Sequence, residues 1–387
     1  MDTPVYLDNA ATTKLSSHLM NQMQPYFKRH WQSPTAPYIK GKEPFTSING
    51  SVEKIYGGVG ANKKDAFVFT SCGAEAISQV FHGVYFETVY ESGKNHFLTS
   101  PIEDASILMM IKRFESVGCS KKLLSLNEKG HIVLENLVSA ISPRTVMLSL
   151  SYANGLTGVI QPIADIAELC QEKGILLHVD VSDILGKIYF CFEDMPIDFL
   201  TFDGDRIHAP KGTGGLFIRS PRTLAPLIAD GTEQNGNRGG TLNVPGIIGL
   251  GFACDELQDH FDHMAIEVAR LRNKLENGLL NGIPSAKVFF HTSERLPSTT
   301  VIGFLGIPSE LLAFHLAEHN IFASFGGGRT QKLESILIAC GVDPLEAKCA
   351  LSFSLSRDTT EEEIDLTIGV IVDVANRCLS FSREIIR

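Results

Sequence analysis

The stretch 200-LTFDGDRIHAPKGTGGLFIR-219 contains two apolar runs separated by a short polar turn. With their flanking residues, the runs 198–203 and 214–220 have the length and composition of buried strands. The turn holds Asp203, Asp205 and Arg206 beside glycines, which favour tight backbone geometry. The sequence therefore predicts a buried strand, a tight charged turn and a second strand.

Apolar runs and helical patterns alternate in the part of the chain that precedes this unit. Such alternation predicts an α/β layered fold with a largely parallel sheet. The expected strands are 65–70, 95–100, 144–153 and 175–181, and the expected helices are 74–86, 105–117 and 163–174.

The pattern changes near residue 248. A long amphipathic helix is expected over 249–280, and the shorter strands and helices that follow it are typical of an α+β domain. We therefore expect an N-terminal segment over 1–15, a large domain over 16–248 and a small C-terminal domain over 249–387.

Composition excludes several classes of function. The 387-residue chain has a formal net charge of −10, which argues against a nucleic-acid surface because phosphate contacts need clustered Lys and Arg. No apolar run is long enough to cross a membrane and no signal-peptide pattern is present, so we expect a cytoplasmic protein. The eight cysteines lack the spacing of zinc ligands, which predicts buried thiols and no cysteine-based metal site.

Six stretches, in order along the chain, resemble motifs of the cysteine desulfurases, the NifS-like branch of class V aminotransferase-fold enzymes. The resemblance implies a fold-type-I transferase-like α/β fold, pyridoxal phosphate (PLP) as cofactor, and a homodimer whose active sites are shared between subunits. The stretches are YLDNAATT (6–13), FTSCGAEA (69–76), TGVIQPIADIAELCQEKGILLHVD (157–180), RIHAPKGTGGLFIR (206–219), RGGTLNVPGIIG (238–249) and TTEEEID (359–365).

The resemblance places Arg206 where these enzymes keep the lysine that holds PLP as a Schiff base. A guanidinium stays protonated at any working pH and cannot form that imine. Lys211 matches the second lysine of the family motif, which is not the Schiff-base residue. We expect Arg206 to form a salt bridge with Asp203 or Asp205, the two acids that replace the family's phosphate-contacting Ser and His.

Other positions that carry the family's chemistry are also replaced. The ring-stacking His matches Asp104, the Gln beside the PLP phenolic oxygen matches Asp183, and the arginine that grips the substrate carboxylate matches Ser352. The phosphate-loop Thr matches Ala74. The sulfur-accepting loop, 323–332, contains no cysteine. Two cysteines near these motifs, Cys72 and Cys340, are expected to be structural.

Part of the implied site is kept. Asp180 matches the acid that pairs with the pyridine nitrogen, Asn154 matches an Asn beside the ring, and Thr241 matches the residue that reaches the neighbouring subunit's phosphate. His178 lies two residues before Asp180 and so on the same face of its strand, and Arg357 keeps the second arginine of its motif. If PLP binds, the residues around it would be Asn154, Asp180, Asp183, Asp203, Asp205 and Thr241.

The first interpretation is a catalytically degenerate desulfurase-like homodimer with an interaction or regulatory role. By analogy with the family, its partner would be a sulfur-transfer or iron–sulfur scaffold protein. One alternative is a PLP enzyme that uses Lys211 or binds PLP non-covalently. A second alternative is an acidic pocket that binds a divalent cation or a cationic ligand through Asp104, Asp180, Asp183, Asp203 and Asp205.

Overall fold

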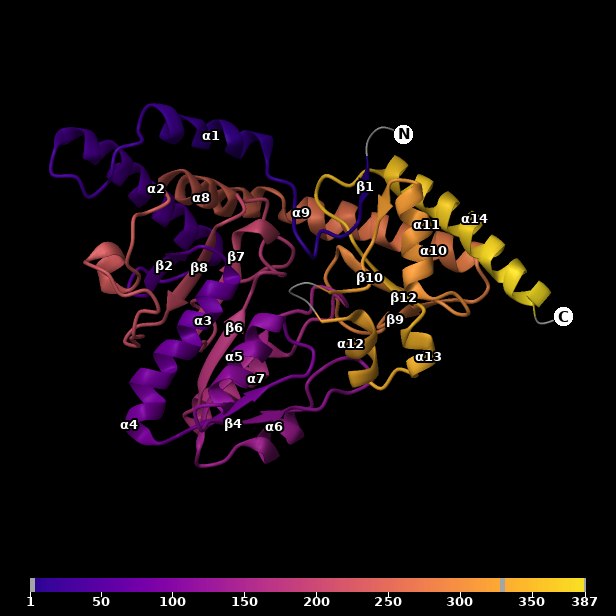
Figure 1. The fold of residues 1–387 in the computed structure, drawn as a ribbon, viewed down its shortest axis with the longest axis horizontal. Coiled ribbons are helices and arrows are strands. Elements are labelled where there is room, and N and C mark those ends of the chain that lie inside the picture. The colour runs from indigo at the N-terminus through magenta and orange to yellow at the C-terminus, as the bar shows by residue number, and fades with distance from the viewer. Residues whose placement is uncertain (1–3, 328–330, 386–387) are drawn as a thin grey trace.

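The computed structural model describes residues 4–327 and 331–385. A large lobe is built around one seven-stranded sheet, and a smaller lobe comes mainly from the C-terminal part of the chain (Figure 1). The expected strand–turn–strand unit is present as β7 (Phe199–Asp203), the short 3-10 turn Gly204–Arg206 and β8 (Gly214–Ile218).

The large sheet has the strand order β2-β8-β7-β6-β5-β3-β4. Its pairs are parallel except those that β8 makes with β2 and β7, which are antiparallel. The predicted fold class, a mostly parallel α/β sheet, is therefore confirmed. The remaining strands of this sheet are β2 (Ala66–Thr70), β3 (His96–Thr99), β4 (Ser120–Leu123), β5 (Thr145–Ser151) and β6 (Leu176–Asp180).

Helices cover both faces of this sheet because successive strand residues point to opposite sides. Leu200 and Phe202 of β7 pack into a cluster with α2, α7 and α8, whereas Phe199 packs with α3 and α5 on the other face. These helices are α2 (Lys42–Val59), α3 (Gly73–Val84), α5 (Ala105–Glu115), α7 (Ile163–Lys173) and α8 (Val244–Asp259).

The smaller lobe contains an antiparallel sheet of order β12-β10-β9 and a separate parallel pair, β1 with β11. Val5 and Leu7, from the beginning of the chain, are buried in this lobe's core, so the N-terminal segment packs with the C-terminal half (Figure 1). Its elements are β1 (Val5–Tyr6), α10 (Ala269–Gly282), β9 (Ala286–Phe289), β10 (Thr299–Phe304), α11 (Ser309–Glu318), β11 (Ile321–Phe322), α12 (Leu333–Ala339), α13 (Pro344–Ala347), β12 (Ala350–Ser354) and α14 (Glu361–Ile385).

The long helix expected over 249–280 differs in the structure. It begins earlier, at Val244, where the Asn243 side chain accepts a hydrogen bond from the Gly246 amide and caps the helix. Beyond Asp259 it is interrupted by α9 (Phe261–His263) and the π-helical turn Met264–Val268 before α10 continues. The α8 portion packs into the large lobe's core.

Several elements were not expected from the sequence. The edge strand β4 (SKKL) lacks apolar alternation, and α2 carries glycines and a proline that weaken its helical pattern. Further examples are β1, β11, α13, α1 (Ser17–Lys28), α4 (Tyr90–Ser92), α6 (Leu134–Ala140), the 3-10 turns Ile39–Gly41 and Glu233–Gly236, and the π-helical turn Tyr85–Val89.

Candidate functional site

The candidate site lies at the carboxyl ends of the central parallel strands. Ser151, Asp180 and Asp203 are the last residues of β5, β6 and β7, and all three line one pocket. This edge of an open α/β sheet is where such folds bind ligands. We call it the acidic pocket; its other lining residues are Gly73, Ala74, Ile77, Asp104, Ser106, Ser182, Asp183 and Arg206.

Arg206 closes one side of the acidic pocket. Its side chain is 4% exposed, and its Nη1 donates a hydrogen bond of 2.8 Å to Oδ1 of Asp183. Burial alone would lower the pKa of Arg206, but the charge and hydrogen bond of Asp183 raise it above its ordinary value. The expected salt bridge with Asp203 or Asp205 is therefore wrong: the loop after β6 brings Asp183 to the guanidinium instead.

Lys187 is a second cation beside the same carboxylate. Its Nζ lies 3.9 Å from Oδ1 of Asp183, and its side chain is 11% exposed. Burial lowers the pKa of Lys187, and the charge of Arg206 lowers it further, while Asp183 opposes both. Lys187 was not predicted as a site residue, although its i,i+4 spacing from Asp183 is one at which an acid and a base can pair.

Asp203 occupies the end of the pocket where the resemblance would put the cofactor's phosphate. A Cβ built on Gly73, the first residue of α3, would lie 3.2 Å from Oδ2 of Asp203, so the carboxylate sits against the start of this helix. Helix N-termini favour anions. The Asp203 carboxylate therefore takes the electrostatic place of a phosphate. Nearby, the Ser71 amide donates to Glu75, which also pairs with Arg238.

Asp180 is the end of a buried hydrogen-bonded chain. Thr201 Oγ1 donates to Asp180 Oδ2 at 2.7 Å and lies 2.9 Å from Nε2 of His178, whose Nδ1 lies 2.8 Å from Oγ of Ser149. Since Thr201 gives its one proton to Asp180, His178 must donate through Nε2 and accept from Ser149 through Nδ1. Burial lowers the pKa of His178 to about 3, so the ring is neutral.

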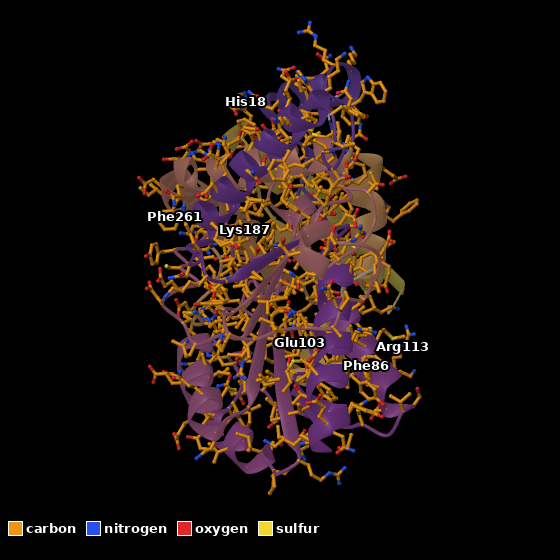
Figure 2. The ribbon with its side chains drawn as sticks, turned by 90° about the vertical axis from the view of Figure 1, so that its left-hand side faces the viewer. His18, Phe86, Glu103, Arg113, Lys187 and Phe261 are labelled. Carbon is orange, nitrogen blue, oxygen red and sulfur yellow. The ribbon has the colours of Figure 1, made fainter. Side chains whose placement is uncertain are left out.

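Burial makes two acids at this edge of the sheet, Asp180 and Glu103, costly to ionise. Burial raises the pKa of Asp180 to about 7, with a further rise from the charge of Asp104. Burial likewise raises the pKa of Glu103 to about 7, against hydrogen bonds from Ser100 and Ser151. Glu103, labelled in Figure 2, is 3% exposed. It was not singled out in the sequence, although it precedes Asp104.

Asp104 serves the helix that follows it. It is the N-cap of α5, and its Oδ1 accepts from the Ser106 amide at 3.0 Å and from the Ser106 hydroxyl at 2.7 Å. This carboxylate satisfies one of the helix's unpaired amides, a task that needs an oxygen and no ring. The residue at the family's His position therefore has a structural task here.

Two further predicted site residues are bonded to neighbouring backbone. Asn154 Oδ1 accepts from the amides of Leu156 and Thr157, while its Nδ2 donates to the Ile102 carbonyl. Ser352, at the substrate-arginine position, is 1% exposed and donates to the Leu156 carbonyl at 2.6 Å. A buried hydroxyl that donates to a backbone carbonyl carries no positive charge with which to bind a substrate carboxylate.

Other predicted residues lie away from the acidic pocket. Thr241 is exposed and lines a different surface hollow with Arg238, and Lys211 is exposed and is absent from the pocket lining. Asp205, in the turn after β7, is also absent from that lining. The structure thus gathers Asp104, Asp180, Asp183 and Asp203 but leaves these three outside.

Of the two cysteines near the motifs, Cys340 is buried and Cys72 is not, and the structural role expected of Cys72 stays a prediction. Cys340 is 3% exposed in the core beside α12, and burial raises its pKa to about 12. Cys72 is the N-cap residue of α3 and is partly exposed. In the sulfur-acceptor loop the sequence holds no cysteine; its residues 328–330 lie outside the described part of the chain.

The residues of the acidic pocket do not fit PLP. The cavity is about 30 Å³, which is room for one or two water molecules. Arg206 cannot form an imine and is already paired with Asp183. The carboxylate of Asp203 occupies the phosphate end of the pocket, and Asp183 pairs with Arg206 at the position beside the phenolic oxygen.

Two absences concern only the part of the chain that the structure describes. Within residues 4–327 and 331–385, no group of three or more His, Cys, Asp and Glu side chains has the arrangement of a metal site. Over the same ranges, no helix combines the length and apolar character needed to cross a membrane.

Known proteins match this chain over nearly its whole length. The family model described as Aminotransferase class-V matches residues 5–367. A cysteine desulfurase of Nostoc sp. is 34% identical over 381 residues, 98% of this chain and 94% of its own. Cysteine desulfurase IscS of Clostridium botulinum is 31% identical over 376 residues, 96% of this chain and 94% of its own. A solved NifS-like protein has a TM-score of 0.91 at 30% identity, covering 98% of this chain and 100% of that one.

Proposed function

The chain belongs to the aminotransferase class-V family, and on that premise we propose that it is a cysteine desulfurase-like protein that has lost desulfuration and acts by binding other proteins. Its partners would be sulfur-transfer or iron–sulfur scaffold proteins, the class with which the family works. We expect it to form a homodimer, as the family does, in the cytoplasm.

One observation carries this proposal: the buried ion pair between Arg206 and Asp183 at the place of the imine lysine. A permanently protonated guanidinium cannot act as the nucleophile that PLP chemistry requires. The pair also uses the carboxylate that stands beside the cofactor position. The proposed loss of the reaction therefore involves both Arg206 and Asp183, and not only a missing lysine amine.

Two further replacements support the same conclusion. Ser352 supplies a buried hydroxyl where a substrate carboxylate would need a cation. No thiol is encoded in 323–332 to accept sulfur, and sulfur transfer requires a thiolate nucleophile. Cofactor, substrate and sulfur acceptor would each lack a residue.

The alternatives receive no specific support. An enzyme based on Lys211 would need an exposed amine to enter a pocket it does not line. Non-covalent PLP would have to occupy a cavity of about 30 Å³ between carboxylates. To bind a metal cation, the acidic pocket would need three or more His, Cys, Asp or Glu side chains in a metal-binding arrangement, and the described residues form no such arrangement.

The test combines catalysis and binding. Purified protein with added PLP and a thiol reductant should release no sulfide from L-cysteine, and Arg206→Lys should not restore release because Ser352 and the loop remain unchanged. An active desulfurase assayed in parallel is the control. Sulfide from the wild-type chain would contradict the loss of activity. In the second arm, calorimetry with an iron–sulfur scaffold protein should detect binding; no binding would remove the partner half of the proposal.

A further inference from the structure

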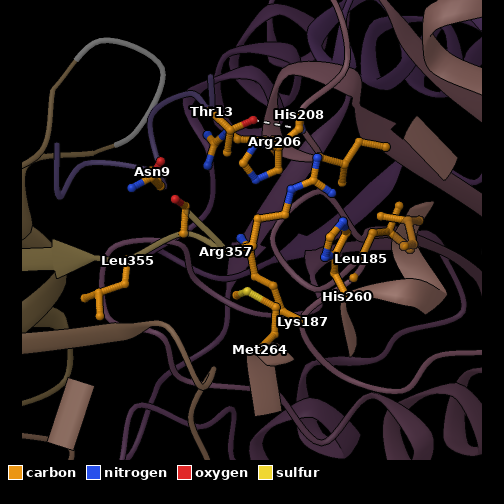
Figure 3. Close-up of a pocket in the computed structure, with 14 residues that line it drawn as sticks. Asn9, Thr13, Leu185, Lys187, Arg206, His208, His260, Met264, Leu355 and Arg357 are labelled. Carbon is orange, nitrogen blue, oxygen red and sulfur yellow. Dashed lines mark hydrogen bonds between the residues drawn. The ribbon is translucent and has the colours of Figure 1, made fainter. Parts of the chain in front are cut away.

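A second cavity is also lined by Arg206 and lies between segments that are distant in sequence. It is formed by the N-terminal segment, the loop after β6, the turn before β8, the end of α8 and the end of β12 (Figure 3). The cavity is about 30 Å³, enough for one or two water-sized species. Arg206 lines it as well as the acidic pocket, so this side chain forms part of the wall between them.

The lining of this cavity is cationic. Lys187, Arg206 and Arg357 contribute three charged groups, and His208 and His260 contribute two imidazoles. The described lining residues include no carboxylate; the rest of the wall is Asn9, Thr13, Leu185, Gly186, Ile207, Leu257, Met264, Leu355 and Ser356. We call this space the cationic cavity.

The cations of this lining outnumber the carboxylates that form ion pairs with them. Asp183 pairs with both Arg206 and Lys187, and Glu256 pairs with Arg357 at 2.9 Å. In these direct ion pairs three cations face two carboxylates, while the charges of Asp8 and Asp358 also act on Arg206 and His208 from outside the lining. Asp104 and Asp205 act on Arg206 through longer-range charge, from outside this lining. Leaving a buried charge uncompensated is costly.

Hydrogen-bond donors are also left over. Arg206 is 4% exposed, and its buried Nε has no hydrogen-bond partner among the described residues. Within those residues, Lys187 Nζ makes only the 3.9 Å ion pair with Asp183, which is longer than a hydrogen bond. Buried donors normally have an acceptor. Both unsatisfied groups belong to residues that line the cationic cavity.

The pKa of His208, which also lines the cavity, is affected by the neighbouring charges. Its Nδ1 lies 2.9 Å from the Lys14 carbonyl and must donate to it, which leaves Nε2 as the unprotonated nitrogen. Burial lowers the pKa of His208 to about 4, and the charges of Arg357 and Lys187 also lower it, against the hydrogen bond to Lys14 and the charge of Asp358. The backbone at His208 has φ 61°, a left-handed conformation unusual for this residue type, held by a hydrogen bond from its amide to Thr13 Oγ1.

We propose that the cationic cavity binds a small monovalent inorganic anion of the size of chloride. The two unsatisfied donors and the lack of a carboxylate among the described lining residues favour an anion, and the cavity volume restricts it to a small monovalent ion because it excludes sulfate, phosphate and larger carboxylates. Nε of Arg206 and Nζ of Lys187 are the donors for it. Bound there, the anion links the loop after β6 to the β7–β8 turn. The site does not depend on whether the chain has lost desulfurase activity.

Thermal unfolding with sodium chloride, bromide or gluconate at constant ionic strength tests the site. Chloride and bromide should raise the Tm saturably by about 1–2 °C over gluconate, because a ligand that binds only the folded state stabilises it. Lys187→Met should abolish this response, and Lys211→Met, at an exposed lysine, should keep it. Equal Tm in the three salts, or a full response in Lys187→Met, would overturn the proposal; a general salt effect would not depend on Lys187.

A second measurement keeps the proposal testable if Lys187→Met does not fold. Crystals of the wild-type chain soaked in sodium bromide should show anomalous density between Arg206 and Lys187. In solution, bromide should raise the pKa of His208, followed by imidazole NMR signals, because an anion offsets the positive field. Absence of bromide density in the cationic cavity, or an unchanged His208 titration, would contradict the assignment.

Discussion

The acidic pocket and the cationic cavity are both lined by Arg206, but they differ in whether their charged groups have partners within the chain. In the acidic pocket each carboxylate on which the site depends has donors from the chain: Arg206 for Asp183, Thr201 and Ser182 for Asp180, Ser106 for Asp104. In the cationic cavity, Nε of Arg206 and Nζ of Lys187 have no hydrogen-bond acceptor within the described part of the chain.

Under the proposed function, the difference shows how a family scaffold would keep its shape without its cofactor. Internal charges replace the interactions that an external ligand would make, so the acidic pocket needs none. The cationic cavity instead contains donors that have no acceptor among the described residues. Both spaces have a volume of about 30 Å³, so they differ in the charges of their lining residues and not in size.

The largest effect is expected at the shared wall. Arg206→Met removes one partner of a buried pair and should lower the free energy of unfolding by about 3–5 kcal/mol, towards the low end because Lys187 still faces Asp183. Urea denaturation measures the loss. Arg222→Met is the matched control, since its ion pair with Asp198 is half exposed and should contribute about 0–1 kcal/mol.

The double variant Arg206→Met/Asp183→Asn sharpens this result. Removing the carboxylate as well should recover part of the loss, because no unpaired charge is then left. If Arg206→Met costs no more than Arg222→Met, the pair does not hold the wall and the comparison fails.

A smaller, pH-dependent effect is expected inside the acidic pocket. The folded pKa of Asp180 is raised to about 7, so its protonated form stabilises the fold at low pH, and this contribution is lost as the pH rises through about 7. Asp180→Asn cannot ionise. Its stability relative to wild type should therefore improve between about pH 5 and about pH 8.5, measured by urea denaturation.

Two features make this pH test specific. His178 titrates with the opposite sign, because its pKa is lowered to about 3, but it is present in both proteins and cancels in the difference. Asp165→Asn, at an exposed acid of α7, is the control and should follow wild type. A stability difference for Asp180→Asn that stays constant with pH would show that Asp180 is not strained by burial.

The smallest effect is expected at Asp104. Asp104→Ala removes the N-cap of α5 and should cost about 1 kcal/mol of unfolding free energy, whereas Asp104→Ser keeps a capping oxygen and should stay closer to wild type. Thermal denaturation of the two variants at pH 7 checks this. If Asp104→Ala is instead stabilising, repulsion with Asp180 outweighs the cap, and the acidic pocket is less well compensated than we infer.

Much of the fold could be predicted from the sequence because it depends on local patterns. The alternation of strands and helices placed β2, β3 and β5 to β8 to within a few residues, and Gly174 ends α7 with φ 62° as expected of a helix stop. The family resemblance is confirmed by the match over residues 5–367. Elements without such patterns, β4 and α2, were missed. The expected domain boundaries stay a prediction.

The site was predicted only in part, because the sequence does not show which charges meet. The replacements at Asp104, Asp183, Arg206 and Ser352 followed from motif positions, but the partner of Arg206 did not. Asp183 reaches Arg206 through the loop after β6, a tertiary contact over 23 residues. Lys187 and the cationic cavity depend on packing between the N-terminal segment, α8 and β12, which no local pattern encodes.

The absorption spectrum of the purified protein tests the central claim most directly. Spectra would be recorded before and after addition of PLP, then after dialysis, with mass spectrometry following borohydride reduction. The account predicts no absorption band above the protein band after dialysis and no PLP adduct on Lys187 or Lys211, because Arg206 and Asp183 fill the cofactor's place. A band that survives dialysis, with an adduct on either lysine, would contradict it and return the chain to the PLP enzymes.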